Sequence, residues 1–194
     1  MEMSNAEFLS NMEVEVKAKI DDIRGVKRKI LASGGSFISR NLIRDFSLDF
    51  EDRRLQERDY VLRVRVFEDG KGVITFKGPR KVDKQYKIRE ELEVHVNNGM
   101  NAVKIFERLG FRVIFRIDRI REIYEFKDEK VQVMLDVFPE IGSFMEVEGN
   151  KKGIEEVIKK LGMRREEFTA LTLRHYIEDY KNRFGSVPKL TFDD

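Results

Sequence analysis

The sequence contains no cysteine and no tryptophan, and only 3 of its 194 residues are proline. Without cysteine, the chain has no disulfide, no zinc–thiolate site and no thiol nucleophile. It also lacks any apolar run close to the about 20 residues that a membrane-spanning helix needs, and its N-terminus has no secretory signal pattern. These absences predict a cytoplasmic protein. Together with abundant lysine, glutamate and arginine, they also suit a thermophile.

Charge of one sign is not in excess either. Lysine and arginine number 38 and aspartate and glutamate 36, for a net charge of +2, so no bulk attraction to nucleic acid or to an anionic membrane is expected. Hydrophobic residues make up 41% and charged residues 38% of the chain, which indicates a globular protein that is rich in charge. We expect a flexible lead-in over residues 1–11, a single domain over residues 12–180 and a tail over residues 181–194.

The hydrophobic pattern predicts an α+β fold. Alternating residues predict strands over 12–20, 36–50, 60–67, 73–77, 85–96, 111–127, 131–137 and 141–149. Helical spacing predicts helices over 22–33, 97–110, about 154–161 and 166–180. The basic stretch over residues 80–84 is expected to be a loop.

The first strand carries its charges at every second position. Side chains alternate between the two faces of a strand, so Glu13, Glu15 and Lys17 share one face and Val14 and Val16 share the other. The same alternation recurs at Arg63 and Arg65, Thr75 and Lys77, Arg89, Glu91 and Glu93, Arg119 and Arg121, Asp136, and Glu146 and Glu148.

Two interpretations fit this pattern. The charged faces point to water around a central apolar core, or the sheet closes so that the charged faces line a polar interior and helices cover the apolar faces. Period and spacing keep every strand amphipathic in both cases, so the pattern alone does not choose between them.

The kinds of charge suggest a ligand. Carboxylates can hold a hard divalent cation through oxygen; the candidates are Glu13, Glu15, Asp136, Glu146 and Glu148. Lysine and arginine can hold phosphoryl oxygens; the candidates are Lys17, Arg63, Arg65, Lys77, Arg89, Arg119 and Arg121. Carboxylates beside such cations are what a triphosphate with its metal requires.

In chain order, these residues form a set of motifs. They are Glu13-x-Glu15-x-Lys17 (ExExK), Leu62-Arg63-Val64-Arg65 (LRxR), Thr75-Phe76-Lys77-Gly78-Pro79 (TxKGP), Arg89 with Glu91 and Glu93 (RxExE), Arg119 with Arg121, Leu135-Asp136, and Gly142 to Glu148 (GxFxExE). The ordered set resembles the CYTH superfamily, the triphosphate tunnel metalloenzymes. That superfamily groups class IV adenylyl cyclases with thiamine triphosphatases and inorganic triphosphatases. The resemblance covers about residues 12–180.

The resemblance implies a closed eight-stranded antiparallel β-barrel that forms a tunnel, with a charged interior and helices packed outside, so that Val14 and Val16 face the helices. It implies that Glu13, Glu15, Asp136, Glu146 and Glu148 bind Mg²⁺ or Mn²⁺. It implies that Lys17, Arg63, Arg65, Lys77 and Arg121 grip the triphosphate, with Arg89 and Arg119 as further ligands. Catalysis is assigned to Lys17, Glu91 and Arg121.

Two departures bear on the reaction. Class IV cyclases often carry a His-Phe pair ahead of ExExK, where this chain has Glu7 and Phe8, and the family's Ser-Tyr near the C-terminus is His175-Tyr176 here. Hydrolysis of a nucleotide, thiamine triphosphate or tripolyphosphate is therefore favoured. A class IV cyclase that forms cyclic AMP and pyrophosphate, and a non-catalytic polyphosphate- or nucleotide-binding module, remain alternatives.

The expected partner is a small-molecule triphosphate, with no membrane and no nucleic acid, because Glu91 and Glu93 would repel a phosphate backbone. A homodimer is left open.

Overall fold

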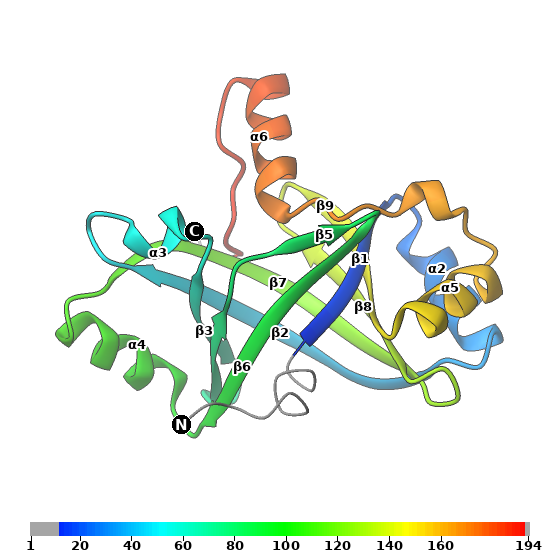
Figure 1. Ribbon diagram of the computed structural model, residues 1–194, viewed down its shortest axis with the longest axis horizontal. Helices are drawn as coiled ribbons and strands as arrows, with labels where there is room; N and C mark the ends of the chain where they lie inside the picture. The colour runs from blue at the N-terminus through cyan, green and yellow to red at the C-terminus, as the bar shows by residue number, and fades with distance from the viewer. Residues whose placement is uncertain (1–11, 193–194) are drawn as a thin grey trace. The chain divides into compact units, whose positions relative to one another are not determined.

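The computed structural model describes residues 12–192 (Figure 1). The predicted lead-in over residues 1–11 lies outside the described residues. The chain groups into two compact units. The first unit contains residues 12–13, 42–81 and 88–118, and the second contains residues 14–41, 82–87 and 119–192. The expected single domain over residues 12–180 stays a prediction.

The strands form one sheet whose pairing closes on itself. Their bounds are Met12–Ile20 (β1), Ser36–Asp49 (β2), Val61–Phe67 (β3), Gly72–Lys77 (β4), Lys81–Asp83 (β5), Tyr86–Val96 (β6), Arg112–Phe126 (β7), Val131–Phe138 (β8) and Gly142–Gly149 (β9). The hydrogen-bonded order is β1-β9-β8-β7-β2-β3-β4-β6-β5, and β1 also pairs with β6. The predicted closed eight-stranded antiparallel barrel of an α+β fold is thus confirmed, with β5 as an extra strand. The loop expected over residues 80–84 contains this short strand.

The helices have bounds Ile23–Ala32 (α2), Arg54–Glu57 (α3), Gly99–Arg108 (α4), Lys151–Lys160 (α5) and Leu173–Phe184 (α6), and Arg165–Glu167 is a 3-10 turn. At α2, α4 and α5 the side chains of Asp22, Asn98 and Asn150 accept a hydrogen bond from the backbone N–H three residues on. Such caps satisfy one of the free N–H groups of a first helical turn. None of the helices within residues 12–192 is long and apolar enough to span a membrane.

The last helix differs from its prediction over residues 166–180. Thr169 pairs with Lys17 of β1 through two backbone hydrogen bonds of 2.9 and 2.8 Å, which hold this part of the chain extended. α6 therefore starts only after Thr172, and it runs past residue 180, where the tail was expected, to end at Gly185 with φ +72°.

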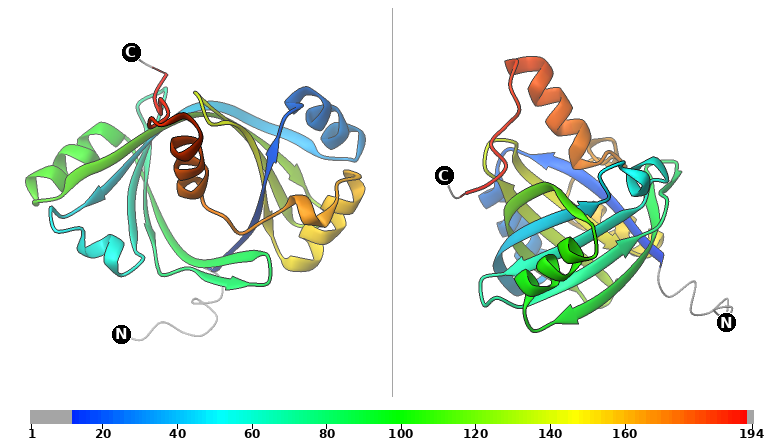
Figure 2. Two further views of the ribbon diagram at one scale, coloured as in Figure 1. Left: turned by 90° about the horizontal axis from the view of Figure 1, so that it is seen from above. Right: turned by 90° about the vertical axis from the view of Figure 1, so that its left-hand side faces the viewer.

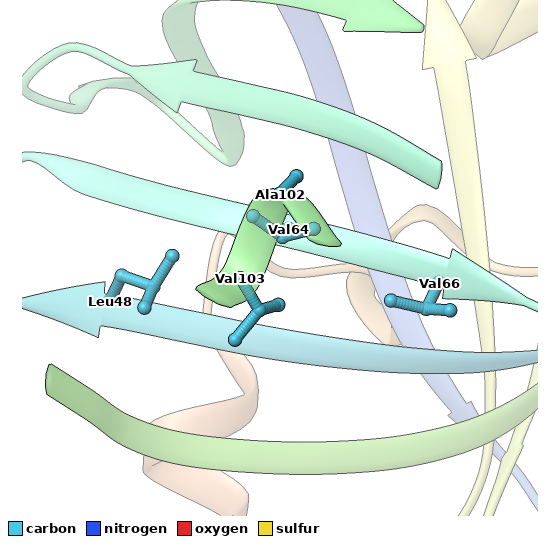
Figure 3. Packing of buried hydrophobic residues seen from close by; sticks show 5 residues of the cluster. All are labelled: Leu48, Val64, Val66, Ala102 and Val103. Atoms are coloured by element: carbon cyan, nitrogen blue, oxygen red, sulfur yellow. The ribbon is translucent and has the colours of Figure 1, made fainter. Parts of the chain in front are cut away.

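In the first unit, α4 covers the apolar face of the sheet. Leu48 of β2, Val64 and Val66 of β3, and Ala102 and Val103 of α4 form a buried cluster (Figure 3). Because side chains alternate along β3, Arg63 and Arg65 lie on the opposite face. The period-2 pattern thus sends the apolar residues to the helix and the charges away from it.

The second unit repeats this arrangement. Val16, Val147 and Val133 are aligned across β1, β9 and β8 and are fully buried. α5 packs against β8 and β9, and a side-chain carbon added at Gly153 of α5 would lie 2.8 Å from the side chain of Val131. Val131 shares its strand face with Val133. Val16 therefore lies on the helix-covered face, as predicted.

A second helix covers the same face. α2 lies beside α5 (Figure 2), and the Ser33 hydroxyl at the end of α2 donates to the carbonyl of Lys160, 3.0 Å away. Lys27 of α2 bonds to Glu122 of β7, which alternation places on this apolar side. The charged side chains on the other face of β1, β7, β8 and β9 point away from these helices and pair with one another.

Truncation of a buried helix residue tests this packing. We expect Ile154→Ala in α5, where the side chain is 0% exposed, to lower the free energy of unfolding by about 3 kcal/mol. We expect Ile105→Ala in α4, where the side chain is 59% exposed, to change it by less than about 0.5 kcal/mol. Urea unfolding measures both, and equal losses would contradict the packing of α5 on β8 and β9.

Candidate functional site

Each unit carries a cluster of charged and polar side chains on the sheet face opposite its helices. The first cluster, in the first unit, consists of Glu13, Asp45, Arg63, Arg65, Thr75, Lys77, Arg89, Glu91 and Glu93. The second cluster, in the second unit, consists of Glu15, Lys17, Lys87, Arg119, Arg121, Asp136, Glu146 and Glu148. Most of these side chains are buried, so the interpretation in which the charged faces point to water does not hold.

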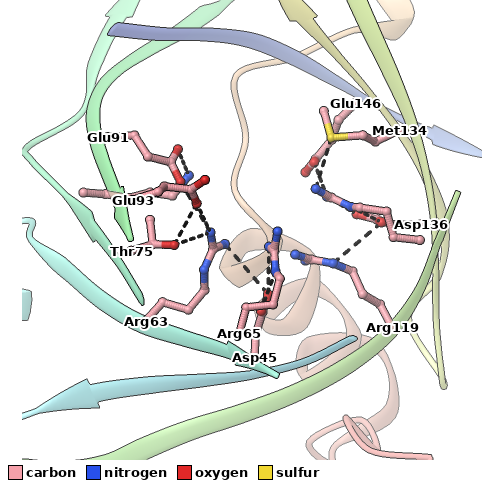
Figure 4. Close-up of polar contacts among 12 residues, drawn as sticks. Asp45, Arg63, Arg65, Thr75, Glu91, Glu93, Arg119, Met134, Asp136 and Glu146 are labelled. Carbon is pink, nitrogen blue, oxygen red and sulfur yellow. Dashed lines mark hydrogen bonds and ion pairs between the residues drawn. The ribbon is translucent and has the colours of Figure 1, made fainter. Parts of the chain in front are cut away.

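Arg63 has many weak contacts in the first cluster. Its Nη2 donates to Thr75 Oγ1 over 3.1 Å and to Glu91 Oε1 over 3.4 Å, and it lies 3.6 Å from the Glu93 carboxylate (Figure 4). Its Nε is buried and has no hydrogen-bond partner within residues 12–192. Buried N–H groups in proteins normally have a partner, so this nitrogen is a donor that a ligand can satisfy.

Lys77 joins two carboxylates in the same cluster. Its ammonium donates to Glu13 over 2.9 Å and to Glu91 over 2.5 Å. Burial raises the pKa of Glu91, but Glu13, Lys77 and Arg63 together outweigh burial and lower that pKa. Glu91 is therefore ionised at neutral pH.

Arg65 is held more firmly than Arg63. Asp45 lies directly opposite Arg65 across β2 and β3, and its carboxylate accepts two hydrogen bonds from Arg65, of 2.9 and 3.2 Å. Such a bidentate pair fixes the plane of the guanidinium. Asp45 was not predicted as a site residue, because polar and apolar residues are mixed on both faces of β2.

Arg89 differs from the other predicted phosphate ligands. Its guanidinium donates to the main-chain carbonyls of Gly78 and Asp59. Burial lowers the pKa of Arg89. These donors tie β6 to Gly78 after β4 and to Asp59 before β3, and a phosphate would have to compete with both carbonyls.

Arg121 is the centre of the second cluster. It lies opposite Asp136 across β7 and β8 and donates to both carboxylate oxygens, over 2.7 and 2.6 Å. Its Nη2 also donates to Glu146 over 2.5 Å. Arg119 Nε lies 3.6 Å from Asp136, so two arginines share one buried carboxylate.

Lys17 completes this network. It lies opposite Glu146 across β1 and β9, and its ammonium is 2.8 Å from the Glu146 carboxylate. Burial raises the pKa of Glu146, but the charges of Lys17, Arg121 and Arg119 outweigh it and hold that pKa well below its usual range. Glu146 is therefore ionised at neutral pH.

The structure adds Lys87 to the second cluster. Its ammonium donates to Glu15 over 2.5 Å, and Glu15 lies opposite Glu148 across β1 and β9. Sequence reasoning missed Lys87, although it continues the alternation of Arg89 and Glu91 two residues toward the N-terminus.

The predicted metal ligands have the right donor chemistry. Glu15, Glu146 and Glu148 share one face of adjacent strands and offer carboxylate oxygens, which Mg²⁺ and Mn²⁺ prefer. Within residues 12–192, no three acidic or histidine side chains converge as they would around an ion. Instead, Glu13, Glu15, Asp136 and Glu146 each bind a lysine or an arginine.

Comparisons with known proteins agree with the motifs. The model of a family described as "CYTH domain" matches residues 11–172. "Putative adenylate cyclase MJ0240" of Methanocaldococcus jannaschii is 38% identical over 162 residues, which are 84% of this chain and 90% of that protein.

Solved structures of two archaeal proteins have a similar fold. The PH1012 protein of Pyrococcus horikoshii matches with a TM-score of 0.69 and 28% identity over 82% of this chain and 96% of its own. A conserved hypothetical protein of Pyrococcus furiosus matches with a TM-score of 0.71 and 25% identity over 85% and 99%. Neither name states an activity.

Removal of the central arginine tests the second cluster. We expect Arg121→Met to lower the free energy of unfolding by about 3 kcal/mol at pH 7, because Asp136 and Glu146 stay buried with less positive charge. The folded-state pKa of Glu146 is depressed, so its stabilisation is present above the unfolded pKa of about 4.3 and is lost as the pH falls through the folded value. The gap between wild type and variant should therefore narrow below about pH 4.

Urea unfolding between pH 7 and pH 3 measures this gap. Arg183→Met is the control, because Arg183 is 67% exposed and pairs with Asp179 on the surface of α6. It should change the free energy of unfolding by less than about 0.5 kcal/mol. A gap for Arg121→Met that does not change with pH would contradict the ionised network.

Proposed function

Because this chain belongs to the CYTH domain family, we propose that it is a divalent-metal-dependent enzyme that acts on the triphosphate of a nucleotide, thiamine triphosphate or tripolyphosphate. We favour hydrolysis as its reaction. The observation that carries the proposal is the burial of cations beside carboxylates: Lys17 is 8% and Arg121 is 7% exposed. Charges that serve only solubility lie in water, because buried charge is costly.

The cations offer the donors that phosphate needs. Arginine binds phosphoryl oxygens through two parallel N–H groups, and lysine binds them as a point charge. Arg63 has a buried Nε that no residue within 12–192 satisfies, and its contacts to Glu91 and Glu93 are longer than 3.3 Å. A phosphoryl oxygen would satisfy that nitrogen and replace these weak contacts.

The acids would hold the metal. Glu13, Glu15, Asp136, Glu146 and Glu148 would supply its oxygen ligands, as the family resemblance implies. When bound, Mg²⁺ or Mn²⁺ supplies charge neutralisation and fixes the phosphates for in-line attack. The lysines and arginines that now bind these acids are then free to turn to phosphate oxygens.

In the hydrolysis we propose, a water oxygen bonds to the terminal phosphorus while the bridging P–O bond breaks. Tripolyphosphate and water then give pyrophosphate and orthophosphate. Glu91 is ionised at neutral pH and would accept the proton of the water. Lys17 and Arg121 would stabilise the negative charge on the phosphoryl oxygens.

A class IV adenylyl cyclase is the second candidate, and the name of the relative from Methanocaldococcus jannaschii supports it. In that reaction the 3′-hydroxyl of ATP attacks the α-phosphorus and pyrophosphate leaves. The residues at the family's Ser-Tyr position both contact other side chains, at the start of α6 or in the sheet. His175 Nδ1 lies 3.0 Å from the Thr172 hydroxyl, and the ring centroids of Tyr176 and Phe144 are 4.7 Å apart. Glu7 and Phe8 lie outside the described residues. A cytoplasmic location and a homodimer stay predictions.

Substitution of one cation from each unit tests the activity. With Mg²⁺ or Mn²⁺, we expect phosphate release from tripolyphosphate, ATP or thiamine triphosphate. Arg63→Met and Lys17→Met should each lower kcat/KM at least about 100-fold, because each removes charge that stabilises the transition state. Lys159→Met removes an exposed charge from α5 and should leave kcat/KM unchanged.

If wild type turns over none of the three substrates, the proposal is wrong. It is also wrong if Arg63→Met and Lys17→Met each keep the kcat/KM of wild type. Thermal stabilisation by tripolyphosphate without any product would indicate the non-catalytic binding module instead.

The products formed from ATP separate the two enzymatic candidates. Hydrolysis predicts ADP and orthophosphate, whereas cyclisation predicts cyclic AMP and pyrophosphate. We expect ADP as the main product with either metal, measured by liquid chromatography. Cyclic AMP in excess over ADP would identify a cyclase.

A further inference from the structure

Lys87 is a partly buried cation that binds a predicted metal ligand. Its ammonium lies 2.5 Å from Glu15 Oε1, and the two side chains are 12% and 9% exposed. None of the sequence motifs includes Lys87.

The start of β6 is anchored so that Lys87 points to this carboxylate. The neighbouring Tyr86 is buried; its hydroxyl donates to Glu155 of α5, and Arg165 Nε donates to the same carboxylate over 2.7 Å. The Tyr86 ring lies 4.9 Å from the Arg165 guanidinium and 5.3 Å from the Lys151 ammonium. Because Tyr86 is held on the side of α5, strand alternation directs Lys87 to the opposite, charged face.

Glu15 needs a cation at this place. Glu15 and Glu148 lie directly opposite each other across β1 and β9, and like charges at such positions destabilise a sheet. Glu15 is also buried, which makes an uncompensated charge costly. The Lys87 ammonium supplies positive charge at Glu15.

We propose that Lys87 is an internal counter-ion of the metal site, which a divalent cation must displace from Glu15. This inference rests on the proposed function, which assigns Glu15 to the metal. With no metal bound, Lys87 neutralises Glu15 and so lowers its repulsion from Glu148. The ammonium and the metal compete for the same carboxylate oxygens, so Lys87 lowers the metal affinity of the free protein.

Metal binding without substrate measures this competition. Isothermal titration of the full chain with Mn²⁺ should show a dissociation constant about tenfold lower for Lys87→Met than for wild type, because no ion pair has to be broken. Lys159→Met removes the same charge from an exposed position of α5 and controls for net charge. It should bind Mn²⁺ as wild type does.

Thermal unfolding gives a second readout. Without metal, Lys87→Met should unfold at a lower temperature than wild type, and Mn²⁺ should raise its Tm by more than that of wild type. Lys87→Met combined with Glu15→Gln removes both charges, so it should fold without metal and lose the gain in Mn²⁺ affinity. If Lys87→Met folds only with Mn²⁺, the proposal is supported; if Mn²⁺ does not restore its folding, the proposal is wrong.

The outcomes separate this inference from the proposed function. Equal or weaker Mn²⁺ binding by Lys87→Met, with metal-dependent turnover by wild type, overturns only the role of Lys87. Binding by Lys87→Met alone supports that role. If neither protein binds Mn²⁺, the role of Lys87 is wrong; if wild type in addition shows no metal-dependent turnover, the metal-dependent function is wrong as well.

Discussion

The neutralisation of buried charge is the constraint on which the rest of this structure depends. In each unit, helices cover the apolar face of the strands, and the alternating side chains on the other face are charged. A buried ion costs several kcal/mol unless it is paired and hydrogen-bonded. The fold meets this cost with ion pairs across neighbouring strands, such as Arg65 with Asp45 and Arg121 with Asp136. The register of the strands therefore determines both which apolar side chains form the core and which charged side chains pair.

The pairs differ in how firmly they hold their cation. Arg121 makes two hydrogen bonds of 2.7 and 2.6 Å to Asp136, whereas the ion pairs of Arg63 to its acids span 3.4 to 3.8 Å. Firm bidentate pairs orient a guanidinium but leave fewer donors for a ligand. Weak contacts and an unsatisfied Nε are what Arg63 would need to bind the anion of the proposed function. Both kinds are useful in a phosphate site, one for position and one for affinity.

Much of this was predictable from local pattern. The period of two located the strands and assigned Glu15, Lys17 and Val16 to faces that the structure bears out. The predicted start of the last helix, at residue 166, was wrong. The pairing of Thr169 with Lys17 joins segments far apart in the sequence, so no local pattern indicates it. The choice of partners was unpredictable for the same reason, since register decides which acid meets which base. Lys87 was open to prediction because it continues the alternation of Arg89 and Glu91, whereas the mixed pattern of β2 does not mark Asp45.

The ion pairs also bear on how a ligand would enter such a cluster. In the proposed site, each acid that would bind the metal and each cation that would bind phosphate gains most by exchanging its partner when both ligands arrive together. A metal alone would leave displaced cations such as Lys17 buried without an anion, and a phosphate that drew Lys17 away would leave Glu146 with fewer cations. Each half-occupied state therefore carries the cost of an unpaired buried charge. Metal and triphosphate together replace both sets of partners at once, so a network of this kind favours their joint binding over either ligand alone.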